Sequence, residues 1–126
     1  MDLYVPLFKV LKTEGGFTIS AGSLRPVNYN SGYAVGGKSK VLTGKMDSLT
    51  FTKFKVKLSS LRHRGGLIGG WVDSKDNKYY LEATQYVSNK STALSMANSR
   101  GEIAIWDFKN TCEIRLTEIK TTKEEF

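Results

Sequence analysis

The sequence predicts an α+β fold, a single domain in which one or two helices pack on one face of a mostly antiparallel sheet. Its 126 residues, 40% hydrophobic and 25% charged, have the composition of one soluble domain. Two segments rich in strand formers, residues 67–72 and 79–87, flank a cluster of turn residues and predict a hairpin. No linker or repeat divides the chain, so residues 1–126 are expected to form one domain, with a frayed polar tail at 120–126.

In the first half, short strand-like pieces are expected at residues 3–11 and 17–20. The apolar residues of the segment 49–64 fit both strand alternation and helical spacing. We interpret this segment as a helix that is capped near Thr52 and ended by the glycine pair at Gly65.

The second half continues from the hairpin into a helix and two strands. Ser88 or Asn89 can cap a helix that ends at Gly101. Strands are then expected at 103–108 and 112–116, with a turn between them.

The charge is concentrated in one part of the chain. Residues 1–72 carry eleven Lys/Arg and three Asp/Glu, a net of +8, whereas residues 73–126 carry eight and nine, a net of −1. Within residues 38–64 the only acid is Asp47, and the basic residues are Lys38, Lys40, Lys45, Lys53, Lys55, Lys57, Arg62 and Arg64.

Clustered positive charge attracts phosphate backbones or acidic protein surfaces. In a helix, Lys53 and Lys57 would lie on one side with Lys55 nearby. The candidate binding residues are therefore Lys38, Lys40, Lys53, Lys55, Lys57, Arg62 and Arg64. The expected partner is nucleic acid, or an acidic or nucleic-acid-handling host protein. The alternative is a solvated face that keeps the protein soluble.

The stretch GYAVGGKS, Gly32–Ser39, fits the phosphate-binding pattern G-x-x-x-x-G-K-[ST]. That chemistry needs a buried strand before the loop and a helix N-terminus after it. Neither residues 25–31 nor residues 40–44 provide one. We interpret the match as a glycine-rich turn beside a strand, and nucleotide binding stays the less favoured alternative.

Other patterns do not indicate an enzyme. His63 stands between two arginines, which disfavour its protonated form. Cys112 is the only cysteine, and Asp73 and Asp76 fall in a predicted turn where solvation accounts for them. We expect no catalytic residue, no metal site and no cofactor.

The start MDLYVPLF does not have the pattern of a secretory signal, and no apolar run approaches the roughly 20 residues needed to span a bilayer. The single cysteine agrees with a reducing compartment. A cytoplasmic protein without a membrane partner is expected.

One block of residues resembles a small domain found in uncharacterised proteins of bacteriophages and bacterial mobile elements. It comprises GGWVD at 69–73, YYL at 79–81, the spaced alanines Ala93 and Ala97, and IAIWDF at 103–108. The resemblance covers about residues 66–116 and carries no site residues. It implies a phage accessory protein that acts by binding in the cytoplasm of the host cell, for instance as a host-defence inhibitor or by coating nucleic acid.

Three hypotheses follow. The favoured one is a non-enzymatic module that binds nucleic acid, or a complex that handles it, through its basic face. The second is a virion or assembly protein, for which homo-oligomers are expected. The third is nucleotide binding at Gly32–Ser39.

Overall fold

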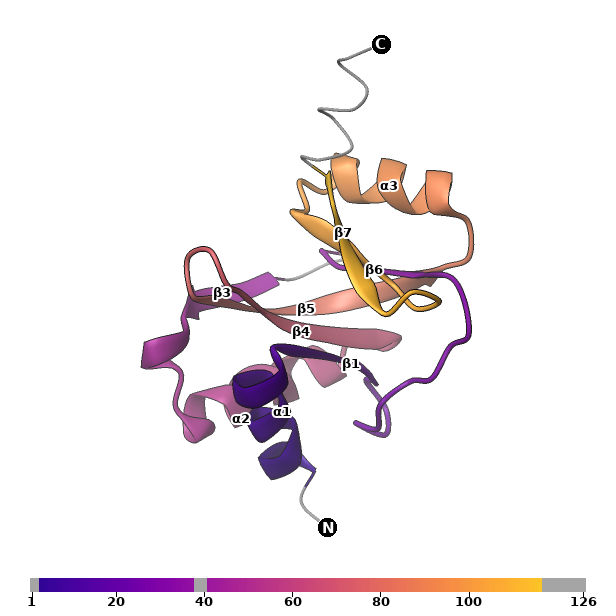
Figure 1. The fold of residues 1–126 in the computed structure, drawn as a ribbon. Coiled ribbons are helices and arrows are strands. Elements are labelled where there is room, and N and C mark those ends of the chain that lie inside the picture. The colour runs from indigo at the N-terminus through magenta and orange to yellow at the C-terminus, as the bar shows by residue number, and fades with distance from the viewer. Residues whose placement is uncertain (1–2, 38–40, 117–126) are drawn as a thin grey trace.

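The computed structural model describes residues 3–37 and 41–116 (Figure 1). Its elements are α1 (Tyr4–Glu14), β1 (Gly16–Ser20), β2 (Tyr33–Val35), β3 (Val41–Lys45), the 3-10 helix η1 (Met46–Ser48), α2 (Phe51–Arg62), β4 (Leu67–Asp73), β5 (Lys78–Val87), α3 (Lys90–Ser99), β6 (Ala104–Asp107) and β7 (Cys112–Arg115). The predicted α+β class is confirmed, with three α-helices in the described chain where one or two were expected. Lys38, Lys40 and the tail predicted to fray lie outside the described residues.

The first element is a helix, so the strand expected at residues 3–11 is wrong. Leu7 and Leu11, one helical turn apart, are both buried. Pro6 lies in the first turn, where a backbone N–H has no acceptor within the helix. Gly15 follows α1 with φ 86°, the left-handed conformation that favours glycine after a helix.

Helices α2 and α3 confirm the two helical predictions. Thr50, two residues before the expected cap, accepts a hydrogen bond from Lys53 N at 3.2 Å. Asn89 caps α3 by accepting from Thr92 N at 3.0 Å. Side-chain oxygens at these positions satisfy N–H groups that the first turn leaves free. None of the helices in the described part is long and apolar enough to cross a membrane.

The described strands form one antiparallel sheet with the order β1-β4-β5-β2-β6-β7. Strand β5 pairs with β4 along one edge, and with both β2 and β3 along the other. The β4–β5 and β6–β7 hairpins and the strand at 17–20 confirm the corresponding predictions.

The helices cover one face of this sheet in two layers. Helices α1 and α2 pack over Ile68 and Leu81, and α3 packs over Val35 and Val87. Leu81 and Val87 have the same parity along β5, so they point to the same face. Because the sheet curls, the two layers lie at opposite ends of the molecule in Figure 1.

The other face carries buried polar side chains. Glu82 and Thr84 of β5 are 4% and 3% exposed. The curl brings β7 toward β4, where Arg115 Nη2 lies 3.6 Å from Asp73 Oδ2. The solvation expected for Asp73 is therefore wrong: it ends β4 and is buried beside Arg115.

Candidate nucleic-acid interface

A groove of about 390 Å³ lies between α2 and β3. Three lysines line it: Lys45 at the end of β3, and Lys53 and Lys57 on α2. Gly44 and the ring of Tyr79 also contribute to the lining. A Cβ at Gly44 would lie 3.0 Å from that ring, so glycine lets β3 pass close over Tyr79.

The local structure explains why these lysines converge. Lys53 and Lys57 are four residues apart, which places them on the same side of α2. The β3–β5 register pairs Lys45 with Lys78, and η1 then leads the chain back to α2. The hydroxyl residues Ser48 and Thr52 complete the polar lining.

Three lysines give the groove a positive charge, and no carboxylate of the described residues lines it. The ion pairs among the described residues all involve Arg115, so none of the three lysines has a carboxylate within 4 Å there. Within the described part of the chain, Lys53 Nζ donates to the carbonyl of Ser48, at 3.4 Å. The first turn of α2 carries no acidic residue, and its free N–H groups add positive potential at this end of the groove.

Lys55 and Arg62 lie on a different side of α2. Lys55 is two residues from Lys53, a rotation of about 200° around a helix, and its Nζ lies 5.5 Å from the centroid of the Tyr4 ring. A hydrogen bond with Ser59 lowers the pKa of Tyr4, and the charges of Arg62 and Lys55 add to this effect. Lys55, which was expected near Lys53 and Lys57, therefore lies on another side of the helix.

The two arginines differ from the groove lysines. Arg62 Nη2 donates to the Gly22 carbonyl at 2.8 Å, and its Nε donates to Ala21 at 3.3 Å. Arg64 follows α2 and is exposed. Of the predicted binding residues, the structure thus brings together Lys53 and Lys57. It adds Lys45, which belongs to the basic segment 38–64 but was not among the candidate binding residues.

The motif Gly32–Ser39 includes a strand of the sheet. Strand β2 occupies its middle, between β5 and β6. Gly36 and Gly37 follow β2, and the next element in the described chain is the strand β3. A phosphate-binding loop needs a helix at that place. Lys38 and Ser39 lie outside the described residues.

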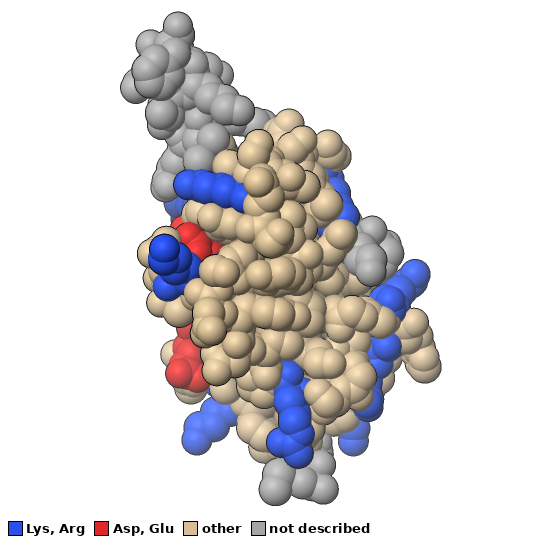
Figure 2. Space-filling model, turned by 90° about the vertical axis from the view of Figure 1, so that its right-hand side faces the viewer, with Lys and Arg blue, Asp and Glu red and all other residues tan. Residues whose placement is uncertain are grey.

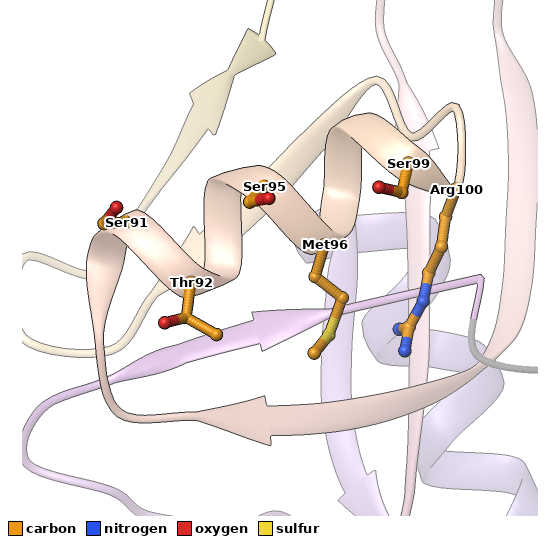
Figure 3. Close-up of a pocket in the computed structure, with 6 residues that line it drawn as sticks. All are labelled: Ser91, Thr92, Ser95, Met96, Ser99 and Arg100. Atoms are coloured by element: carbon orange, nitrogen blue, oxygen red, sulfur yellow. The ribbon is translucent and has the colours of Figure 1, made fainter.

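A second hollow, of about 520 Å³, runs along α3 (Figure 3). Its lining is Ser91, Thr92, Ser95, Met96, Ser99 and Arg100. Figure 3 shows the Arg100 side chain extending from the end of α3 toward the strands, where its guanidinium donates to Gly36 O and Gln85 Oε1. Since that charge is already engaged, the hydroxyl row offers a weaker anion site than the lysine groove.

An aromatic cluster lies elsewhere, where the loop after β1 meets β5 and the β6–β7 turn. The Tyr29 ring stacks on Tyr86 with centroids 4.2 Å apart and meets Phe108 edge-on at 5.1 Å. Tyr29 and Trp106 are 38% and 37% exposed. Figure 2 shows the side of the molecule on which this loop and turn lie: Lys and Arg are mainly toward its edges and lower end, and most of it is uncharged.

No protein-family model, no curated protein and no solved structure matches this chain.

Proposed function

We propose that this protein is a non-enzymatic binding protein that holds the phosphate backbone of a nucleic acid in the groove between α2 and β3. The observation that carries this proposal is the convergence of Lys45, Lys53 and Lys57 on a groove without a lining carboxylate. These three ammonium groups, which have no carboxylate partner among the described residues, attract the phosphates of a nucleic-acid backbone. The hydroxyls of Ser48 and Thr52 can donate hydrogen bonds to phosphate oxygens.

The proposed mode of binding is independent of base sequence, because lysines act as point charges toward phosphates. Three phosphate contacts predict a slope of about −2.7 for the logarithm of the binding constant against the logarithm of salt concentration on duplex DNA, and about −2 on a single strand. This dependence distinguishes backbone binding from recognition through apolar contacts. The phage-type origin stays a prediction, because no match bears on it.

The test is charge reversal in the double variant Lys53→Glu/Lys57→Glu. A matched control, Lys90→Glu/Lys109→Glu, changes the net charge equally at two exposed positions, at the start of α3 and between β6 and β7, neither of which lines the groove. Fluorescence anisotropy with a labelled oligonucleotide should show the groove variant losing more than about tenfold in affinity and most of its salt dependence. The control should retain most of both. Equal losses in the two variants would show that net charge alone, without this groove, causes the binding.

The alternative of an assembly protein is favoured by one observation, the exposed aromatic cluster around Tyr29 on a largely uncharged side. Exposed aromatic rings in an uncharged surface are typical of protein interfaces. In this case size-exclusion chromatography with light scattering should show oligomers. The double variant Tyr29→Ser/Trp106→Ser should disrupt these oligomers, whereas the variant Lys53→Glu/Lys57→Glu should leave them unchanged. A monomer at all concentrations would exclude self-assembly through this surface.

A further inference from the structure

The connection from β2 to β3 contains two glycines that pass close to two carboxyl groups. A Cβ at Gly36 would overlap the Glu82 carboxylate and would lie 2.6 Å from Glu102 Oε1. At Gly37 it would lie 2.9 Å from Glu102 Oε2. Glu82 belongs to β5, and Glu102 lies in the loop between α3 and β6. Side chains from two elements thus converge where only a glycine backbone fits.

Glu82 is incompletely hydrogen-bonded in its ionised form. The residue is 4% exposed, and its Oε1 accepts from Trp71 Nε1 at 3.3 Å. Its Oε2 is buried and has no hydrogen-bond donor among the residues that the structure describes. A buried carboxylate oxygen without a donor is costly, and a second ionised carboxylate beside it would add repulsion. A proton on Glu102 removes both costs, because a neutral carboxyl group can donate to Glu82 Oε2.

The surrounding groups favour this shared proton. Burial, followed by the hydrogen bond and the charge of Glu82, raises the pKa of Glu102 to about 8. Arg100 acts in the opposite direction, but its guanidinium is committed to Gly36 O at 3.1 Å and Gln85 Oε1 at 2.9 Å. Figure 3 shows that this side chain points away from the outer hydroxyl row of α3.

One further charged side chain among the described residues lies near this loop, and other carboxylates engage it. Arg115 of β7 pairs in register with Ala104, two residues after Glu102, and is engaged by Asp73 and Glu113. Trp71 of β4 contributes only its neutral indole N–H. Lys38 and Lys40, which follow the glycines, lie outside the described residues.

We propose that Glu82 and Glu102 form a proton-operated latch that holds the Gly36–Gly37 segment against the loop between α3 and β6. With one proton between the two carboxyl groups the latch is closed. When that proton passes to solvent at alkaline pH, both groups are negative and the latch opens. The latch is separate from the lysine groove, so its test does not depend on the proposed function.

The experiment is a pH titration of the full chain by carbon-detected NMR, from about pH 6 to about pH 9.5, with the variant Glu102→Gln alongside. In the unmutated protein the side-chain carboxyl carbon of Glu102 and the carbonyl carbon of Gly36 should shift with a common midpoint near 8. In Glu102→Gln the Gly36 signal should stay flat. The variant Glu14→Gln, which changes an exposed carboxylate at the end of α1, should retain the titration.

Two results would overturn the proposal. One is a Glu102 carboxyl carbon that titrates below about pH 6, since the pair then shares no proton at neutral pH. The other is a Gly36 titration that persists unchanged in Glu102→Gln. Should that variant fail to fold, the titration of the unmutated protein alone still decides between a shared proton and two independent carboxylates.

Discussion

Replacing Glu102 by glutamine should change how the stability of the protein depends on pH. Glutamine keeps the size of the side chain and donates a hydrogen bond, as the protonated carboxyl group does, but it carries no charge at any pH. The pKa of Glu102 rises from its ordinary value of 4.5 to about 8 in the folded protein. The folded state therefore binds the proton more tightly than the unfolded chain between these two values.

The sign and size of the effect follow from this difference. The stability that Glu102 contributes is fully present below pH 4.5 and is lost as the pH rises through about 8. At about 1.4 kcal/mol per pH unit the ceiling is about 5 kcal/mol. Because Glu102 is partly exposed, solvent screening reduces this to about 1–2 kcal/mol.

Urea unfolding followed by tryptophan fluorescence measures the effect. Near pH 5 the free energy of unfolding of Glu102→Gln should match that of the unmutated protein within about 0.5 kcal/mol. Near pH 8.5 the variant should be more stable by about 1–2 kcal/mol, which moves the urea midpoint by roughly 1 M. The exposed-site variant Glu14→Gln should show a constant difference across this range. Parallel pH dependences of Glu102→Gln and the unmutated protein would refute the reasoning.

Three further substitutions test the packing and the turns. Phe54→Ala empties a fully buried site in the core and should lower the free energy of unfolding by about 3–5 kcal/mol in urea; a loss under about 1 kcal/mol would contradict this packing. Gly32→Ala adds a side chain at φ 91° and 2.6 Å from Tyr86 Cε1. We expect it to lower the free energy of unfolding by about 1–3 kcal/mol and to weaken the near-ultraviolet circular dichroism signal. An unchanged spectrum would show that the Tyr86 ring moves aside freely. Asn89→Ala removes the cap on Thr92 N and should cost about 1 kcal/mol in thermal unfolding, whereas Asn89→Asp should retain most of that stability.

The sequence predicted the second half of the fold better than the first because its signals there are local. Alternating strand formers and turn clusters define β4, β5, β6 and β7 without reference to the rest of the chain. At the N-terminus, the β-branched residues Val5 and Val10 favour a strand. Packing of Leu7 and Leu11 into the core stabilises α1 instead.

The lysine groove shows the same division between local and long-range information. The spacing of Lys53 and Lys57 predicts that they share a side of a helix. That spacing does not predict Lys45, because its position depends on the pairing of β3 with β5, which comes more than thirty residues later in the chain. The same helical geometry that unites Lys53 and Lys57 turns Lys55 away toward Tyr4.

The buried acid pair depends on the curl of the sheet. Tyr80, Glu82 and Thr84 alternate with apolar residues along β5, a pattern typical of a strand with one solvated face. Alternation tells which side chains share a face but not whether a distant strand covers it. Here the curl brings Arg115 of β7 to β4, and the polar face of β5 is buried. Because burial is the first cause of the raised pKa of Glu102, the titration of this carboxyl group reports how completely its surroundings exclude water.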